Sequence, residues 1–240
     1  MKIGLFTDPH YCKADDLGLN RRPVFSLGKI KEAMEAFSRQ GVEICFCLGD
    51  LVDRAKGDTK NDVLENLRSV WDLISSFEIP FYLVPGNHDF VDLTRKDFKQ
   101  MGISLPDSAV SSVETDECKF VMIDANVRSS GRHFDEEGHV WDDANLTNQS
   151  VNTLAKELAS AENKRCMVLV HENLDPTVQE QHIIKNAEEI RRVIKESGAV
   201  NTVIQGHYHE GSDYDEESVH YHALPAMCIG ESNYFEIMEI

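Results

Sequence analysis

Five apolar segments of this chain, each with the length of a buried β-strand, run directly into a short polar motif. The segments cover residues 3–7, 44–48, 81–84, 166–170 and 202–205. The motifs, in the same order, are Asp8-Pro9-His10, Gly49-Asp50-Leu51-Val52-Asp53-Arg54, Gly86-Asn87-His88-Asp89, Val170-His171-Glu172 and Gly206-His207-Tyr208-His209. In an open α/β sheet, ligand sites form beyond the carboxyl ends of the strands. We therefore expect these loops to meet at one site, although they are spread along most of the chain.

The segments between these motifs predict an α/β fold. Apolar residues at helical spacing predict helices over 27–39, which Ser26 would cap and Gly41 would end, and over 61–77. The second half predicts a hairpin, two helices and further strands, over 110–114 with 119–123, 147–161, 178–197, 219–224, 227–229 and 234–238. Alternating strands and helices favour parallel sheets with right-handed crossovers. Without repeats or a Pro-, Gly- or Ser-rich linker, residues 1–240 are expected to form one domain, in which two sheets pack face to face and helices lie outside.

Composition limits the classes of partner that the chain is expected to bind. The 42 acidic residues exceed the 24 basic ones, and the resulting net charge of −18 disfavours binding of long nucleic acids. A small phosphate ester remains compatible, because two divalent cations can reverse the field within one cleft. No apolar run reaches the length of a membrane span, and the start of the chain lacks a signal-peptide pattern, so we expect a cytoplasmic protein. The cysteines in apolar segments are expected to be reduced and buried, whereas Cys12, two residues past His10, is the exception and is expected near the site, where it could be oxidised or could meet a soft metal.

The residue types in the five motifs are those that bind metal ions. Asp8 and His10 alternate past a strand end, so both side chains can leave the same face. Carboxylates and imidazoles suit manganese, iron or zinc. Asp50 has two oxygens that can bridge two ions, and Asn87 adds a neutral amide oxygen. Each motif alone has a structural explanation as a turn or a cap, but five of them at successive strand ends favour a metal site.

With these motifs the chain resembles the calcineurin-like metallophosphoesterases, from Asp8 to His209. The resemblance implies a two-sheet sandwich flanked by helices, in four αββα layers. It places one metal ion at Asp8, His10 and His209, a second at Asn87, His171 and His207, and a bridge between them at Asp50. It also implies that His88 acts on the leaving group or the transition state, and that Asp53 orients His88.

The reaction implied by the resemblance is hydrolysis of a phosphoester by a hydroxide held between two ions. The compact chain is similar to small phosphodiesterases, which include cyclic-nucleotide phosphodiesterases and manganese-dependent ADP-ribose and CDP-alcohol diphosphatases. We expect a small phosphodiester or pyrophosphate-linked substrate. Phosphomonoester hydrolysis is the main alternative, and a non-catalytic interaction module on the same fold is another. The metal identity and the oligomeric state stay open.

Other polar residues are candidates for substrate binding. Arg54 follows the second motif, and Arg21 and Arg22 lie in the loop after the first. A long polar segment over 126–145 predicts a functional loop, whose Arg132 and His133 are candidates for lining a pocket. The remaining histidines are interpreted as structural or surface residues, with the last two on one sheet face: His139, His182, His220 and His222.

Overall fold

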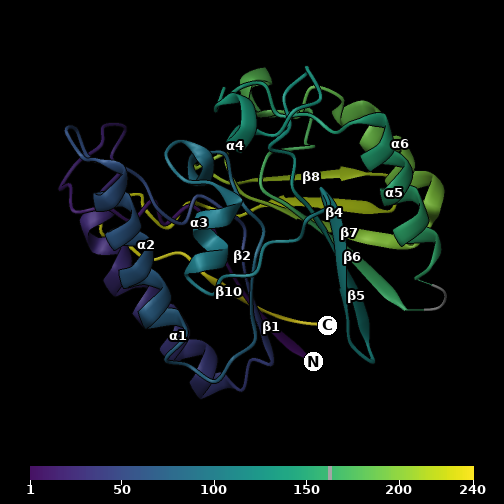
Figure 1. The fold of residues 1–240 in the computed structure, drawn as a ribbon. Helices are drawn as coiled ribbons and strands as arrows, with labels where there is room; N and C mark the ends of the chain where they lie inside the picture. Colours follow the sequence, from purple (N-terminus) through teal and green to yellow (C-terminus); the bar gives the residue numbers. More distant parts are fainter. Residues whose placement is uncertain (162–163) are drawn as a thin grey trace.

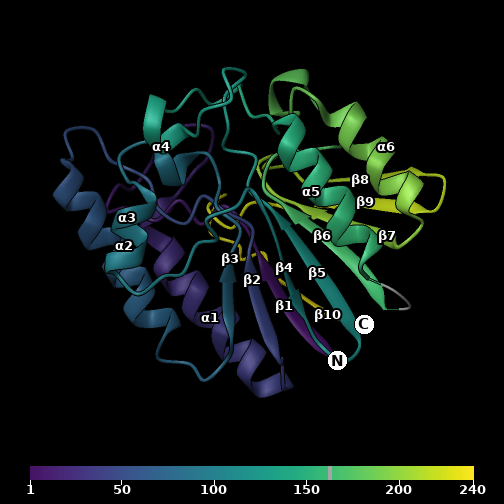
Figure 2. The same ribbon diagram turned by 45° about the vertical axis from the view of Figure 1, so that its right-hand side comes forward.

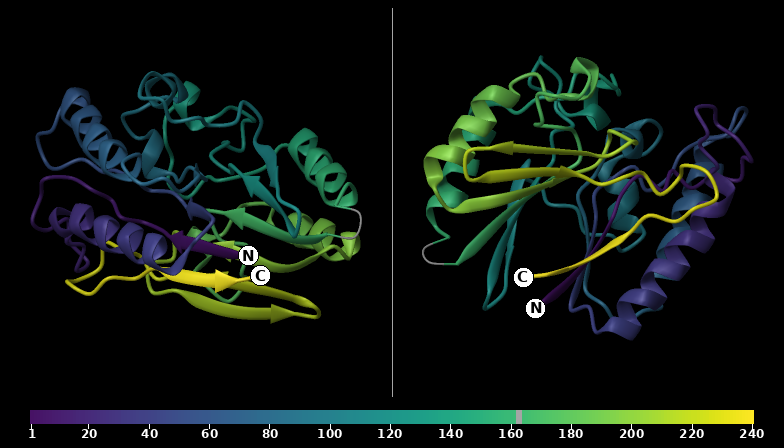
Figure 3. Two further views of the ribbon diagram at one scale, coloured as in Figure 1. Left: turned by 90° about the horizontal axis from the view of Figure 1, so that it is seen from below. Right: turned by 180° about the vertical axis from the view of Figure 1, so that it is seen from behind.

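Two β-sheets packed face to face form the centre of the molecule in a computed structural model that describes residues 1–161 and 164–240 (Figure 1). The first sheet has the order β10-β1-β2-β3. Its strands are β1 (Lys2–Phe6), β2 (Ile44–Cys47), β3 (Phe81–Leu83) and β10 (Glu236–Glu239). β1, β2 and β3 are parallel, whereas β10 is antiparallel to β1. This last pairing brings the two termini side by side (Figure 3).

The second sheet has six strands in the order β4-β5-β6-β7-β9-β8. They are β4 (Val110–Glu114), β5 (Cys118–Ile123), β6 (Arg165–Val170), β7 (Val200–Gln205), β8 (Ser212–Glu216) and β9 (Val219–Ala223). The four inner strands are parallel, and the two edge strands, β4 and β8, are antiparallel to their neighbours.

Helices cover the outer face of each sheet (Figure 2). α1 (Ser26–Gln40), α2 (Lys60–Ile74) and α3 (Arg95–Gln100) lie against the first sheet, and α5 (Asn148–Ala159) and α6 (Ala187–Ser197) lie against the second. Strand residues alternate between two apolar layers, as Cys45 and Cys47 face the helices while Ile44 and Phe46 pack between the sheets. The expected α/β sandwich flanked by helices is therefore confirmed.

Several local predictions were wrong. Ser26 does not cap α1 from outside but lies within it, and its hydroxyl donates to the carbonyl of Pro9, which ties the helix to the first motif. Gly41 does end α1, in the left-handed conformation at φ 69°. The helix expected over 178–197 begins only at Ala187, after a 3-10 turn at Glu180–His182. Residues 227–229 form a loop whose amides bond the strand-end carbonyls of Thr7 and Asp8 instead of forming a strand.

One edge strand and two short helices were missed. β8 reads Ser-Asp-Tyr-Asp-Glu, which has no apolar alternation because it is an edge strand that exposes much of its length. α3 is only six residues long and carries one buried residue, Phe98. The polar segment 126–145 contains one short helix, α4 (Phe134–Glu137), and otherwise forms loops. Across the described ranges, no helix is both long enough and apolar enough to span a membrane.

Candidate functional site

The five motifs converge beyond the carboxyl ends of β1, β2, β3, β6 and β7, as predicted. Four of their residues adopt the left-handed backbone conformation, which residues other than glycine rarely adopt. They are Asp8, His10, Asp50 and His207, with φ of 52°, 45°, 53° and 62°. Such backbone is uncommon outside glycine and is held only where the surroundings compensate for its cost. The left-handed residues lie at the ends of β1, β2 and β7, and their side chains are buried together.

Glycines allow the loops to approach each other. A Cβ atom at Gly49, which has a φ of +96°, would lie 2.5 Å from the amide nitrogen of Gly86 and 2.6 Å from Nδ1 of His171. A Cβ at Gly86 would in turn lie 2.6 Å from the amide nitrogen of Asp50. Real Cβ atoms essentially never approach other atoms to any of these three distances, so glycine is needed at both positions for the loops to meet.

A first group of metal-ligand atoms comes from the first and last motifs. Nε2 of His10 lies 3.2 Å from Nε2 of His209 and 3.5 Å from Oδ1 of Asp8, and Nε2 of His209 lies 3.3 Å from the same oxygen. Ligands about 2.1 Å from one ion are about 3.0–3.5 Å from each other. The three atoms therefore have the spacing of ligands around a common point.

A second group lies beside the first. Oδ1 of Asn87 lies 3.2 Å from Nε2 of His171, and the ligand atoms of Asp50, His171 and His207 all lie within 4.8 Å of one another. Oδ2 of Asp50 lies 3.4 Å from Nε2 of His171 and also 3.4 Å from Nε2 of His10. The carboxylate of Asp50 thus lies between the two groups.

The donor set fits divalent metal ions. Oδ1 of Asp8 and Nε2 of His207 are buried without a hydrogen-bond partner among the described residues, and both point into the cluster. Nδ1 of His171 bonds the carbonyl oxygen of Leu48 at 2.5 Å. A carbonyl only accepts, so this nitrogen carries the proton and Nε2 presents its lone pair to the cluster. Buried nitrogen and oxygen ligand atoms at this spacing favour a cation between them, either a proton or a metal ion.

Charge complementarity within the cluster shifts its pKa values. Burial would raise the pKa of Asp50, but the nearby imidazoles of His171, His88 and His10 outweigh it and hold the pKa well below its ordinary range. Burial would likewise lower the pKa of His171, but the carboxylates of Asp50 and Asp8 raise it well above its ordinary value. The carboxylates are therefore held ionised, which is the form that binds metals.

Asp89 connects two of the motifs, a role that was not predicted from the sequence. Its carboxylate accepts hydrogen bonds from the amides of Asp50 at 3.0 Å, Leu51 at 2.8 Å and Gly86 at 2.9 Å. Burial and the neighbouring charge of Asp50 raise the pKa of Asp89 to about 7. The Gly-Asn-His-Asp motif contained this residue, but only the fold reveals that its hydrogen bonds link the loop after β2 to the loop after β3.

His88 and Asp53 lie at the edge of the cluster. Nδ1 of His88 is 3.3 Å from Oδ2 of Asp53, and about a quarter of the His88 side chain (27%) is exposed. The same oxygen lies 3.2 Å from Nδ1 of His10 and 3.4 Å from Nη1 of Arg21. Burial would raise the pKa of Asp53, but the hydrogen bond to His10 and the nearby imidazole of His88 keep it well below its ordinary range. One carboxylate thus orients two imidazoles and one guanidinium.

An open cleft of about 970 Å³ leads to this cluster, and aromatic and apolar side chains form much of its wall. Its lining includes, besides cluster residues, Leu19, Arg21, Trp141, Gln179, His182, Tyr208, Glu210, Pro225, Ile229 and Tyr234. Arg22 and Arg54 are not among the lining residues. Nε of Arg22 bonds the carbonyl of Asp15, and Arg54 pairs with Asp92 at 2.9 Å.

The loop over 126–145 contributes to the cleft through residues other than those expected. His133 is not among the lining residues and bonds Asp124 and Asp135, while Arg132 is exposed and also outside the lining. His139, interpreted from sequence as structural, has its Nε2 atom 3.0 Å from Nδ2 of Asn87. Trp141 lies with its ring centroid 6.3 Å from that of His207.

His182 was also missed. Its ring lies 4.9 Å from that of His207 and 5.7 Å from that of Trp141, within the cleft wall. It lies in the 3-10 turn that replaced the start of the expected helix. A lone histidine in a loop carries no pattern, so the sequence offered no signal for its position.

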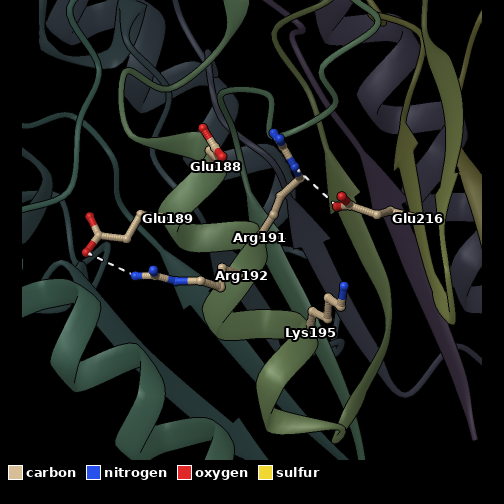
Figure 4. Close-up of a pocket in the computed structure, with 6 residues that line it drawn as sticks. All are labelled: Glu188, Glu189, Arg191, Arg192, Lys195 and Glu216. Atoms are coloured by element: carbon tan, nitrogen blue, oxygen red, sulfur yellow. Dashed lines mark ion pairs between the residues drawn. The ribbon is translucent and has the colours of Figure 1, made fainter.

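A second hollow, on the outer surface of α6, has a different character (Figure 4). Its lining is charged, and two of its arginines form ion pairs, Arg191 with Glu216 at 3.2 Å and Arg192 with Glu189 at 4.0 Å. Lys195 pairs with Glu217 at 2.6 Å. With its cations paired on an exposed helix, this hollow lacks the convergent, buried lone pairs of the strand-end cluster.

Comparison with known proteins adds an independent line of support. Residues 1–211 match the family model described as calcineurin-like phosphoesterase. A probable cyclic nucleotide phosphodiesterase of Coxiella burnetii is 24% identical over 210 residues, which cover 85% of this chain and 76% of that protein. The 3′,5′-cyclic adenosine monophosphate phosphodiesterase of Haemophilus influenzae is 22% identical over 237 residues, or 95% of this chain and 77% of that protein.

The fold is shared with solved structures. A dimetal phosphatase from Danio rerio superposes with a TM-score of 0.85 at 19% sequence identity, and the match covers 98% of this chain and 91% of that one. At this level of identity, the likeness establishes a common architecture of two sheets and flanking helices.

Proposed function

The chain belongs to the calcineurin-like phosphoesterase family and is a metal-dependent phosphoesterase, and from this premise we propose that the strand-end cluster hydrolyses a small phosphodiester or pyrophosphate-linked substrate. The relatives named as cyclic nucleotide phosphodiesterases support this substrate class. Residues 1–240 would act as one domain, and six free, buried cysteines are in keeping with a reducing, cytoplasmic location.

The position of Asp50 is the observation that carries the proposal. Its Oδ2 atom is 3.4 Å from an imidazole nitrogen in each ligand group. Asp8, His10 and His209 would hold one ion, Asn87, His171 and His207 would hold the other, and Asp50 would bridge them. When bound, two such ions lower the pKa of a shared water and neutralise charge on the phosphate oxygens. Nitrogen and oxygen ligands suit manganese, iron or zinc.

His88 and Asp53 would handle the proton of the leaving group. The Asp53 carboxylate, 3.3 Å from Nδ1 of His88, would hold one proton on that nitrogen, and a second proton on Nε2, present in the imidazolium form, would pass to the leaving oxygen. His88 would act as the general acid, and Asp53 would be a positioning residue. Among the residues that the structure describes, Arg21 is the arginine that lines the cleft, and it also contacts the Asp53 carboxylate. It therefore replaces Arg22 and Arg54 as the candidate for binding phosphate oxygens.

The cleft favours a diester over a monoester. A monoester dianion profits from several fixed cations, whereas a diester carries one charge less and needs room for a second substituent. Trp141, Tyr234 and Leu19 provide apolar surface beside the cluster, and each is exposed by 42% or more. Such surface can bury the alcohol or nucleoside portion of a substrate.

Steady-state kinetics on matched esters tests the proposal. The manganese-loaded protein should show a higher kcat/KM for a phosphodiester than for the monoester of the same alcohol, and removal of metal by a chelator should abolish both activities. A clear monoester preference would replace the diesterase assignment by a phosphomonoesterase one. Full activity after metal removal would overturn the assignment of the cluster.

A further inference from the structure

A second group of histidines and carboxylates lies on the β8–β9 hairpin, at the edge of the second sheet. The register pairs Asp213 with His222 and Asp215 with His220, directly across the two strands. Because strand side chains alternate, these four share one face, while Val219 and Tyr221 on the opposite face are buried in the apolar core that includes Ile190 and Ile194 of α6.

Three atoms of this group converge. Nδ1 of His222 lies 2.7 Å and Nε2 of His220 lies 3.2 Å from Oδ1 of Asp213. The ligand atoms of the three residues lie within 4.8 Å of one another. The two imidazole rings stack nearly parallel, with centroids 6.0 Å apart and an interplanar angle of 15°. Two imidazoles and a carboxylate, open to solvent on one side, form a ligand set typical of zinc with water in the fourth position.

The outer nitrogen of each imidazole meets another carboxylate. Nδ1 of His220 lies 2.8 Å from Oδ1 of Asp215, and Nε2 of His222 lies 3.0 Å from Oε1 of Glu236. Metal-binding histidines almost always donate their second N–H to such a partner, which fixes the tautomer and directs the other lone pair at the metal. Here the inner nitrogens of both imidazoles lie against Oδ1 of Asp213, which can only accept. Either extra protons or one cation must fill the space between them.

We propose that Asp213, His220 and His222 form a zinc site distinct from the strand-end cluster, with which they share no residue. Asp215 and Glu236 orient the two imidazoles. Glu236 belongs to β10, the edge strand of the first sheet, whereas the ligands belong to β8, an edge strand of the second sheet, and to its neighbour β9. A bound zinc ion therefore links the open edges of the two sheets through the His222–Glu236 contact, a structural role that is independent of hydrolysis.

Zinc stoichiometry tests this site. The chelator-treated full-length protein is loaded with Zn²⁺, freed of excess metal by gel filtration, and analysed for zinc per chain. The double variant His220→Ala/His222→Ala should retain one equivalent less than the wild-type protein, while its phosphoesterase activity with manganese is unchanged. Equal zinc content in the two proteins would overturn the proposal.

Two single substitutions separate ligand loss from altered folding or charge. Asp213→Asn preserves the shape of the side chain but removes the charge of the ligand, so this variant should also bind one equivalent of zinc less. Glu217→Gln removes the same charge from the turn of the same hairpin, where Glu217 contacts Lys195 rather than the histidines. This control should keep the wild-type zinc content. If Glu217→Gln also lost one equivalent of zinc, the binding would be due to general surface charge, and the proposed site would be refuted.

Discussion

The Nε2 atoms of His10 and His209 lie 3.2 Å apart, although 199 residues separate them in the chain. Two imidazole nitrogens at this distance can share one hydrogen at most, and Oδ1 of Asp8 lies within 3.5 Å of both. A divalent cation satisfies all three atoms at once. This relationship explains why the first and last motifs of the chain act as one site.

Replacement of the bridging carboxylate should weaken both metal sites together. Asp50→Asn removes a negative charge from a residue that lies between the two ligand groups, so the affinity for both ions should fall at least about tenfold, since even outer-shell substitutions cost about 10- to 100-fold. Elemental analysis after gel filtration measures this loss. Asp116→Asn, in an exposed turn, is the control. Two retained equivalents in Asp50→Asn would contradict the bridging role.

Removal of the His88 imidazole should slow the reaction without removing metal. His88→Ala should lower kcat by roughly 10²- to 10⁴-fold, the usual contribution of general acid–base catalysis. The loss should shrink for nitrophenyl esters, whose leaving groups need little protonation. His220→Ala, which removes an imidazole outside the cluster, should leave kcat unchanged. An equal loss with every leaving group would instead assign His88 to charge stabilisation in the transition state.

Two glycines with the same backbone conformation separate strain from crowding. Gly49 and Gly57 both have a φ of +96°, but a Cβ at Gly57 meets nothing within 4 Å, whereas one at Gly49 collides with Gly86 and His171. Both alanine variants incur the left-handed penalty of about 1–2 kcal/mol. Gly49→Ala should lose a further ~1–3 kcal/mol of unfolding free energy through overpacking, and should also lose metal. Urea unfolding of the two variants measures the difference, and equal values would show that the loops can move apart freely.

Trp141 should contribute to the binding of large substrates. Aromatic contacts contribute about 0.5–1.5 kcal/mol, so Trp141→Ala should lower kcat/KM for nucleotide diesters about 2- to 10-fold. Methyl nitrophenyl phosphate, which is too small to reach the ring, should be affected much less. Trp141→Phe keeps an aromatic face and should retain most of the activity. The same loss with the small ester would indicate that Trp141 acts on the cluster rather than on the substrate.

The loop that carries Trp141 should be held more firmly at low pH. Burial alone would lower the pKa of His133, but the hydrogen bond and the charge of Asp124 outweigh it and raise that pKa above its ordinary value of about 6.5. A raised folded-state pKa stabilises the protein fully below pH 6.5, and the stabilisation disappears as pH rises through the folded pKa.

His133→Ala should therefore destabilise the protein by about 1–3 kcal/mol at pH 6, the range for charged hydrogen bonds, and by less at pH 9. Unfolding free energies in urea at both values give the comparison. Asp124→Asn removes the main partner charge and should reduce the pH dependence of the His133→Ala effect, while Asp135 remains in contact with the imidazole. A destabilisation that is the same at pH 6 and pH 9 would show that His133 contributes only through packing.

The sequence by itself determined the architecture and the central ligand atoms. Apolar strand segments alternate with amphipathic helices, which dictates parallel strands, and parallel strands end at one edge of a sheet. The motifs after those strands were therefore expected to meet, and Asp8, Asp50 and His171 do lie within one cluster. This inference was possible because strand direction is a local property of the chain.

Only the tertiary structure decided what surrounds that cluster. Trp141 and His182 line the cleft, and His139 contacts Asn87, because their loops pack across strand ends far away in sequence. An isolated residue in a polar loop has no periodicity that indicates its direction. Arg22 and Arg54 were expected at the site from their place beside motifs, but each bonds a nearby partner outside the cleft. Strand ends are positioned by repetitive backbone geometry, whereas loop side chains are positioned by contacts that form only when the whole chain has folded.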